Sequence, residues 1–341
     1  MTGDREFMLE ALALAQLGWG LTNPNPMVGA VIVRDGKVIG RGFHRKAGEA
    51  HAEINALNDL ARHGESAKDA TIYVTLEPCS TYGRTPPCTE AIIASGIKRV
   101  VIGSLDPNPK HNGKAVEILR AHKIEVEYGI EARACSELNR PFFCWVTTEK
   151  PLVILKMAMT LDGNIATESG DSKWVTGPEA RRRVQQLRRL CDAIMVGANT
   201  VRYDHPQLTV REPESWERQP LRVVASSSFT QDDLDEFFPD GNACVADLST
   251  PEKWEEFLLM LGKKKMTALL IEGGGELAGS ALRAGVVDYV EFHVAPKLLG
   301  GSGRQVVGGL APDLMKHALM LKDVEVKSYG DDIAICGYLK E

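Results

Sequence analysis

HAEINALNDLARH (residues 51–63), ATIYVTL (70–76) and PCSTYGRTPPC (78–88) follow one another in the first half of the chain. The first has the apolar spacing of a helix, and the second is rich in residues that favour a strand. The third is a proline-rich loop that leads into a short helix at about Cys88. This order predicts an α/β layer structure with His51 at a helix start and Cys79 and Cys88 beyond the strand.

The segments on either side continue the same alternation. Residues 5–17 have a helical repeat, and VGAVIV (28–33) and KVIGRG (37–42) predict two strands joined by a hairpin at Asp35-Gly36, a pair that tolerates the positive φ of such a turn. KRVVIG (98–103) predicts another strand, and residues 113–129 predict a further helix and strand. The first half is therefore expected to form one open sheet covered by helices.

His51, Cys79 and Cys88 offer one imidazole and two thiolates, a donor set suited to a catalytic zinc site that keeps its fourth position open. Glu53 lies two residues after the histidine, where it can move protons without binding the metal. The order matches the H-x-E and P-C signature of zinc-dependent base deaminases, although eight residues separate the cysteines here where the signature has two.

The alternative is that His51 caps a core helix and that both cysteines are small buried apolar residues. We favour the metal site because three ligand residues occur in this order together with a glutamate at the right offset.

A second domain is expected after a linker at residues 147–151. Residues 152–166 begin a new strand-rich pattern, and Thr176, Pro178 and Glu179 predict a helix start in which Thr176 is the N-cap of a capping box. Strands are then expected at 193–197, 221–225, 243–246, 267–271 and 288–294, with helices at about 179–190, 252–261 and 276–284.

The glycines at 273–275 lie between an apolar strand and a helix, where backbone can approach a pyrophosphate. A tight turn without a ligand explains them equally well. The dinucleotide fingerprint of a Rossmann domain is incomplete, since no acidic residue follows at the required distance, so another nucleotide-binding architecture fits better.

Five arginines crowd residues 181–189. Arg181 and Arg188 are seven residues apart and share a helix face, which favours a phosphate or carboxylate partner for them. A solvated basic face is expected for Arg182, Arg183 and Arg189.

The composition excludes several classes of protein. The 341 residues are 44% hydrophobic, 25% charged and 6% aromatic, with a formal net charge of -6, as in a soluble globular protein with no positive field for nucleic acid or an anionic membrane. The sequence shows neither a signal peptide nor a membrane span, so a cytoplasmic location is expected. The seven cysteines lack the spacing of a disulfide framework.

NPNPMVG (23–29), GFHRKAGEAHAE (42–53), TLEPCSTYGRTPPC (75–88) and DPNP (106–109) resemble the deaminase half of the bifunctional riboflavin-biosynthesis deaminase/reductase family. The resemblance implies a three-layer cytidine-deaminase-like domain with a central mixed sheet over residues 1–146, with zinc held by His51, Cys79 and Cys88 and with Glu53 as proton shuttle. It places Asn25, His44, Arg84, Asp106 and Asn108 at the ribosyl-phosphate substrate. Thr81 departs from the pattern, because many relatives have histidine there.

KMAMTLDGNIA (156–166), SGDSKWVTG (169–177) and IEGGGELAG (271–279) resemble the reductase half of that family. This implies a dihydrofolate-reductase-like α/β domain over residues 150–341 that uses NADPH. The implied substrate residues are Ser172, Arg188, Leu208, Arg211 and Glu272, and the implied cofactor residues are Ala158, Trp174, Thr200, Asp204, Gly274 and Gly275.

Two features of the second half bear on its chemistry. The ionisable candidates for a proton donor are Lys156, Asp204 and Glu272, and the sequence does not choose among them. Lys156 is named as the possible acid/base of the reductase. Ser226, Ser227 and Ser228 follow a predicted strand and could donate to the 2′-phosphate of NADPH, most directly at Ser227, although a polar turn explains them as well.

The resemblance implies zinc-dependent deamination of 2,5-diamino-6-(5-phosphoribosylamino)pyrimidin-4-one followed by NADPH-dependent reduction of its ribosyl group to ribityl. The expected partners are small-molecule pyrimidine ribosyl-phosphates and further copies of the chain, as a dimer or tetramer through the second domain, with no nucleic acid or membrane. The alternative is a zinc deaminase of nucleic-acid bases with a non-catalytic assembly domain; the net charge and low aromatic content argue against it.

Overall fold

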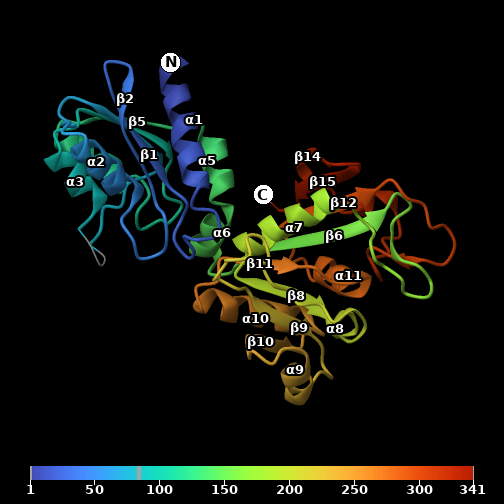
Figure 1. The fold of residues 1–341 in the computed structure, drawn as a ribbon. Helices are drawn as coiled ribbons and strands as arrows, with labels where there is room; N and C mark the ends of the chain where they lie inside the picture. The colour runs from blue at the N-terminus through green and yellow to red at the C-terminus, as the bar shows by residue number, and fades with distance from the viewer. Residues whose placement is uncertain (1, 83–85, 341) are drawn as a thin grey trace. The chain divides into compact units, whose positions relative to one another are not determined.

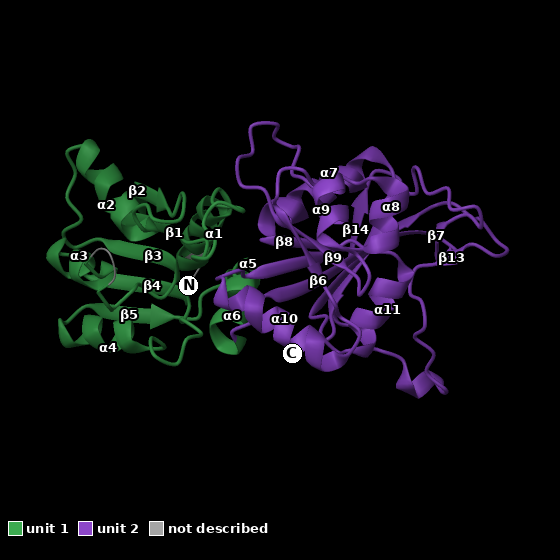
Figure 2. Ribbon diagram, turned by 90° about the horizontal axis from the view of Figure 1, so that it is seen from below, with its two compact units in different colours: residues 1–148 green, residues 149–341 purple. Residues whose placement is uncertain are grey.

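The computed structural model describes residues 2–82 and 86–340, and the chain forms two compact units, residues 1–148 and 149–341 (Figure 2). Each unit is an α/β structure with its own sheet (Figure 1). All seven cysteines lie in described segments and none is in a disulfide, as the sequence predicts. Within the described ranges, no helix is both long and apolar enough to cross a membrane.

The first unit contains a five-stranded mixed sheet with the order β2-β1-β3-β4-β5. The antiparallel hairpin of β1 and β2 forms one side, and β3, β4 and β5 run parallel. The elements are, in chain order, α1 (Thr2–Gln16), β1 (Gly29–Arg34), β2 (Lys37–Phe43), α2 (Ala52–Arg62), β3 (Thr71–Leu76), α3 (Cys88–Ala94), β4 (Arg99–Ser104), α4 (Lys114–Ala121), β5 (Glu125–Tyr128), α5 (Ala132–Leu138) and α6 (Arg140–Thr148).

Alternate residues of the strands divide between two cores. Ile32 and Val74 face one core with Ala56 of α2 and Leu119 of α4, while Val31 faces the other with residues of α1 and α5. This is the three-layer arrangement with a mixed sheet that the sequence predicts. The hairpin is also confirmed, since Asp35 and Gly36 both have positive φ, at 52° and 72°.

The second unit contains an eight-stranded sheet with the order β10-β9-β8-β11-β6-β12-β15-β14. The strands from β10 to β12 run parallel, and β15 and β14 add to β12 antiparallel. Its elements are β6 (Leu152–Thr160), β7 (Asn164–Ala166), α7 (Pro178–Leu190), β8 (Ala193–Gly197), α8 (Ala198–Asp204), β9 (Leu221–Ala225), α9 (Gln231–Phe237), β10 (Ala243–Ala246), α10 (Pro251–Lys263), β11 (Ala268–Ile271), α11 (Gly275–Arg283), β12 (Tyr289–Ala295), β13 (Arg304–Gln305), the 3-10 turn η1 (Met315–His317), β14 (Lys322–Tyr329) and β15 (Asp332–Tyr338).

Helices α10 and α11 cover one face of this sheet, where Trp254 and Leu277 share a core with Leu155 of β6. Helix α7 lies against the opposite face, since its arginines pair with Glu291 of β12 and with Glu272 just after β11. The short strands β7 and β13 form a separate two-stranded ribbon.

Two local predictions for the second half were wrong. Helix α7 is capped by Gly177, whose N–H donates to Asp332 Oδ2 at 2.7 Å, and no capping box forms at Thr176. Glu179 instead faces Arg182 one turn later. The predicted linker also begins too early, because α6 continues through Thr148. The N-cap differs because its hydrogen-bond partner, Asp332, is far from it in the sequence. The linker differs because the helix before it continues to Thr148.

Glycine allows helix α2 to approach the sheet closely. A Cβ on Gly42 of β2 would lie 2.2 Å from the backbone nitrogen of Ala56 and 2.3 Å from the carbonyl oxygen of Ala52. No rotamer change can relieve a collision with backbone, so a side chain there must displace the helix.

We expect Gly42→Ala to lower the free energy of unfolding of the first unit by at least about 2 kcal/mol, because the helix must shift away from β2. Urea denaturation measures this change. Gly3→Ala is the control, since a Cβ at Gly3 meets only Phe7 at an ordinary 3.9 Å. Equal stability of the two variants would contradict the prediction.

Candidate active sites of the two units

His51, Cys79 and Cys88 come together in the first unit. Their ligand atoms all lie within 4.8 Å of one another, with His51 Nδ1 at 3.5 Å from Cys79 Sγ and 3.3 Å from Cys88 Sγ. His51 precedes α2 in an extended conformation and its side chain does not cap the helix, so the ring is free to face the cysteines. Cys79 follows β3, and Cys88 opens α3. The predicted group is therefore assembled by the starts of two helices and the end of one strand.

The donor chemistry of this group fits zinc. Hydrogen bonds from Cys88 and His51 lower the pKa of Cys79, which favours the thiolate, the form that binds the metal. The backbone N–H of Cys88 also donates to Cys79 Sγ at 3.2 Å. Two sulfurs and one imidazole nitrogen leave a fourth tetrahedral position open.

Glu53 lies in the first turn of α2 and is only 3% exposed. Burial raises the pKa of its carboxyl group. A buried carboxyl group beside an open metal position is placed to hold or release a proton rather than to pair with solvent ions.

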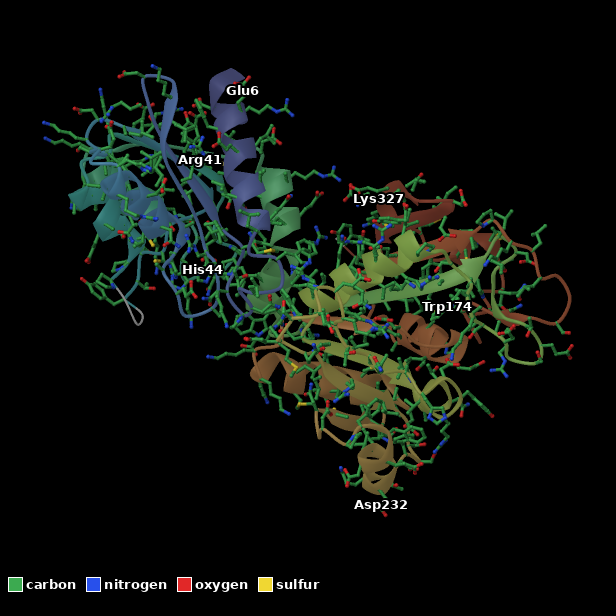
Figure 3. The ribbon with its side chains drawn as sticks, viewed as in Figure 1. Glu6, Arg41, His44, Trp174, Asp232 and Lys327 are labelled. Atoms are coloured by element: carbon green, nitrogen blue, oxygen red, sulfur yellow. The ribbon has the colours of Figure 1, made fainter. Side chains whose placement is uncertain are left out.

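Asn25 and His44 lie beside the metal group. Asn25 Nδ2 donates to His44 Nε2 at 3.2 Å, so the other ring nitrogen carries the proton and donates to the carbonyl of Ala50 at 3.1 Å. The His44 ring (labelled in Figure 3) meets the His51 ring edge-on with 5.4 Å between centroids. Burial lowers the pKa of His44, which favours its neutral form. The structure thus brings two predicted substrate residues to the predicted metal ligands.

Asp106 and Asn108 lie in the loop after β4, where Asp106 Oδ1 accepts from the N–H of Asn108 at 2.8 Å. The sequence analysis did not identify Glu77, which fixes this loop. Its buried carboxylate accepts from the N–H groups of Asp106, Gly113 and Ala115 at 3.1, 3.0 and 2.9 Å. An acidic residue at the end of an apolar strand, directly before Pro78 and Cys79, was the available signal.

Thr81 and Arg84 are the two other positions that the sequence analysis singled out in this part of the chain. Thr81, which departs from the family pattern, is exposed. Arg84 lies outside the described residues, so its predicted contact with substrate stays a prediction.

The second unit contains a cavity of about 1580 Å³ at the carboxyl ends of its parallel strands. Ligands bind at this edge in open α/β sheets because strand ends and helix starts meet there. The predicted residues that line it are Lys156, Ala158, Ser172, Trp174, Arg188, Thr200, Asp204, Arg211, Ser227, Glu272, Gly274 and Gly275. Leu208 is not among the described lining residues; its side chain is buried and its φ is 53°.

Arg188 and Glu272 form a buried pair at the cavity wall. Arg188 Nε and Nη2 donate to the two Glu272 carboxylate oxygens at 2.7 and 2.8 Å, and Nη1 donates to the carbonyl of Thr209 at 3.1 Å. Burial alone would raise the pKa of Glu272, but Arg188, together with Lys156 and Arg211, outweighs burial and lowers it. Both residues were predicted to contact substrate, and the structure shows that each is also the other's counter-charge.

Two of the other arginines of α7, Arg183 and Arg189, differ from the expectation. Arg182 is exposed, as predicted. The predicted solvated face is wrong for Arg183, which pairs with buried Glu291, and for Arg189, which stacks on Trp216 at 4.4 Å from the ring centroid. Apolar and acidic groups from other elements cover both side chains, which a helical pattern alone cannot show. Arg181 lines the cavity, and its guanidinium stacks on the ring of Trp174 at 4.6 Å from the centroid. Trp174 is labelled in Figure 3.

Gly274 and Gly275, in the turn between β11 and α11, have different roles. A Cβ on Gly275 would lie 2.2 Å from the carbonyl oxygen of Gln305, so this glycine is required by chain packing. A Cβ on Gly274 would meet only Thr200 Oγ1, at 3.8 Å. Because Gly274 caps α11 and faces the cavity, its backbone is accessible to a ligand at the helix start.

The three serines after β9 have different roles. Ser226 Oγ accepts from the N–H groups of Ser228 and Phe229, both at 3.1 Å, so Ser226 fixes the turn. Ser227 and Ser228 are exposed and line the cavity. The serines therefore form a polar turn that also lines the cavity, and the contact with the 2′-phosphate of NADPH stays a prediction.

Known proteins match both units. Residues 1–104 match the cytidine and deoxycytidylate deaminase zinc-binding region, and residues 151–335 match the RibD C-terminal domain. The riboflavin biosynthesis protein RibD of Aquifex aeolicus is 41% identical, with 97% of each chain covered, and that of Actinobacillus pleuropneumoniae is 40% identical, covering 97% of this chain and 94% of the relative.

Solved structures match over the whole chain as well. The diaminohydroxyphosphoribosylaminopyrimidine deaminase/5-amino-6-(5-phosphoribosylamino)uracil reductase of Thermotoga maritima has a TM-score of 0.88 at 37% identity, and Acinetobacter baumannii RibD has a TM-score of 0.86 at 37% identity; 99% of each chain is covered in both cases. This chain therefore belongs to the RibD family of riboflavin biosynthesis proteins.

Proposed function

We propose that this chain catalyses the two successive reactions of its family: hydrolytic deamination of 2,5-diamino-6-(5-phosphoribosylamino)pyrimidin-4-one, then reduction of the ribosyl group to ribityl by NADPH. The deaminase is assigned to residues 1–146 and the reductase to residues 150–341. The observation that carries the proposal is the pair of separate sites, a His51, Cys79 and Cys88 group in one unit and a cavity lined by the predicted reductase residues in the other.

In the first unit, His51, Cys79 and Cys88 would hold a zinc ion, which as a Lewis acid makes water a nucleophile at neutral pH. Glu53 takes one proton from the attacking water and delivers it to a ring nitrogen; it then takes the second proton from the hydroxyl of the adduct and delivers it to the departing amino group, so that the amine is replaced by a carbonyl and leaves as ammonia. His44 and Asn25 orient the ribosyl-phosphate beside the metal group, together with Asp106 and Asn108.

In the second unit, bound NADPH would supply a hydride for C1 of the imine that forms when the ribosylamine ring opens. A protein group must supply the proton that the nitrogen gains. Glu272 is held as a carboxylate by Arg188, which makes it a poor donor. Lys156 lies at the cavity wall, and we assign it as the donor. Trp174, Thr200 and Asp204 contact the cofactor with Ala158, Gly274 and Gly275, while Ser172, Arg188, Leu208 and Arg211 form the substrate side with Glu272.

A deaminase of nucleic-acid bases with a non-catalytic second unit is disfavoured. RibD relatives match across both units, and the second unit has a cavity lined by reductase residues. The cytoplasmic location stays a prediction from the sequence.

We expect Glu53→Gln to retain about one zinc per chain and to lower ammonia release by at least about 100-fold, because only the proton carrier is lost. Metal analysis and an ammonia assay measure the two effects. Reduction of the already deaminated substrate should persist at its original rate.

The control for Glu53→Gln is the double variant Cys79→Ala/Cys88→Ala, which should lose both zinc and ammonia release. Zinc that survives in this variant would contradict the metal site. Loss of reduction in folded Glu53→Gln protein would contradict the two-site assignment.

We expect kcat/KM for NADPH to exceed that for NADH by at least about tenfold, or about 1.4 kcal/mol, in the unmodified enzyme. Ser227→Asp should reduce this ratio by weakening the use of NADPH, because a carboxylate repels the 2′-phosphate. Ser227→Ala is the control, since it removes the hydroxyl without adding charge and should change the ratio less. A ratio unchanged in Ser227→Asp would exclude Ser227 from the cofactor site.

We also assign a homo-oligomer that assembles through the second unit. Its edge strand β14 and the adjacent strand β15 expose Val324, Val326, Ile333 and Ile335 at 55, 66, 47 and 37% of their surface. Val326 pairs with Ile335 in register, so apolar groups lie side by side at this edge. Such a contiguous apolar strip supports an interface with a second copy of the same strands.

Val326→Glu should shift the protein to a smaller species in light scattering after gel filtration, since a charge would be buried in the interface. Lys327→Gln, at the next position of β14, should leave the size unchanged. A monomeric unmodified protein, or an unchanged size in Val326→Glu, would contradict this interface.

A further inference from the structure

A buried polar cluster lies outside the residues assigned so far. Arg183 Nε and Nη2 donate to Glu291 Oε1 and Oε2 at 3.0 and 2.9 Å, and His293 Nε2 lies 2.8 Å from Glu291 Oε1. Glu291 and His293 are both 0% exposed. Burying a carboxylate completely costs free energy unless it is paired and hydrogen-bonded, so the contacts of Glu291 must offset the cost of its burial.

The protonation of the cluster follows from its contacts. A carboxylate only accepts, so His293 Nε2 carries the proton that it donates to Glu291. His293 Nδ1 is buried without a hydrogen-bond partner among the residues that the structure describes, and burial lowers the pKa of this histidine, so the ring is neutral. Burial alone would raise the pKa of Glu291, but the hydrogen bonds from His293 and Arg183 outweigh it and lower the pKa to about 2. Glu291 is therefore a fixed negative charge.

The sheet places this charge beside Lys156. Strands β6 and β12 are parallel neighbours in which Lys156 is the partner of Glu291 and Ala158 is the partner of His293. Partners in a ladder point to the same face, so the Lys156 and Glu291 side chains share the face covered by α7. Strand β11 lies on the other side of β6 and ends at Ile271, opposite Leu155, which brings Glu272 next to Lys156 from that side.

Lys156 is therefore flanked by carboxylates from both neighbouring strands. It is 8% exposed, and burial lowers its pKa. Glu272 and then Glu291 oppose this effect most strongly, Arg188 of α7 adds to it, and Asp332 of β15 opposes it. Neutral His293 and the Arg183 guanidinium bonded to Glu291 lie on the same face. Glu272 faces the cavity, where its charge is shared with Arg188, whereas Glu291 is shielded from the cavity contents.

We propose that Glu291 is a positioning residue for Lys156: held by Arg183 and His293, it supplies from the buried side the negative charge that keeps the lysine an ammonium at the cavity wall. This inference rests on the proposed reductase function, in which Lys156 delivers a proton. The other explanation is that the Arg183–Glu291 pair only fastens α7 to the sheet, and this predicts no effect on the protonation of Lys156.

Chemical labelling of Lys156 tests the proposal without relying on activity. The full-length zinc-loaded enzyme is acetylated with a trace of acetic anhydride at a series of pH values, and mass spectrometry of the Lys156 peptide gives the pH at which the amine becomes reactive. In Glu291→Gln this pH should fall by about one unit, so that labelling below it is about tenfold faster, since a unit charge at a neighbouring strand position contributes this much even when partly screened.

Two further variants make the result specific. Arg183→Gln/Glu291→Gln removes both charges, so no guanidinium is left buried alone. A smaller shift in the same direction is expected, because the lysine loses the attraction of its ladder partner together with the repulsion of the guanidinium beyond it; this variant replaces the single one if that protein does not fold. Glu325→Gln is the matched control, because this residue of β14 is half exposed, pairs with Lys327 at 2.6 Å and should give the original profile. A Lys156 profile unchanged in the folded Glu291 variants would overturn the proposal.

The pH dependence of reductase kcat separates the positioning role of Glu291 from the proposed role of Lys156 as proton donor. If Lys156 is the proton donor, the alkaline limb of reductase kcat in Glu291→Gln moves to lower pH with the labelling profile, while KM for NADPH stays within about twofold. A labelling shift without reductase activity in the unmodified enzyme would contradict the proposed function and leave the positioning role intact. An equal loss of rate at every pH with no labelling shift would show that Glu291 is only structural.

Discussion

Strands that run parallel end at the same edge of their sheet, and both candidate active sites depend on this constraint. In the first unit, β3 and β4 end beside each other, so Cys79, Glu77 and the loop that carries Asp106 come to one edge. In the second unit, β6, β8, β9 and β11 end together around the cavity. The edge gathers residues that are far apart in the sequence, and helix starts add N–H groups to it. Neither site could be built by one element alone.

Buried pairs of opposite charge stabilise the walls of the second site. Arg188–Glu272 and Arg183–Glu291 both connect α7 to the sheet, five residues apart on the helix and on either side of β6. Each pair satisfies the hydrogen-bonding groups of a carboxylate that is fully buried, as Glu291 is, or largely buried at the cavity wall, as Glu272 is. Because the pairs anchor the helix and also set the field at Lys156, the packing of α7 and the chemistry of the cavity are coupled.

Much of the architecture could be predicted because it depends on local pattern. The hairpin at Asp35-Gly36 follows from residues that tolerate positive φ, and the strands at 193–197 and 221–225 follow from short apolar runs. The antiparallel strands β14 and β15 were missed, since KDVEVKSY mixes charged and apolar residues on an exposed edge. The N-cap of α7 was misplaced because its partner, Asp332, lies 155 residues away.

The sequence by itself determined which chemistry the chain can carry. A histidine, a glutamate and two cysteines in that order provide zinc ligands and a proton carrier, because these side-chain types have the required donor atoms and acidity wherever the fold places them. Only the tertiary structure decided which charges act on which groups. Arg183 belongs to the same basic helix as Arg182, yet one is buried against Glu291 and the other is exposed. The reason is physical: burial and charge pairing depend on the neighbours that the fold brings within a few ångströms, and those neighbours come from distant parts of the chain.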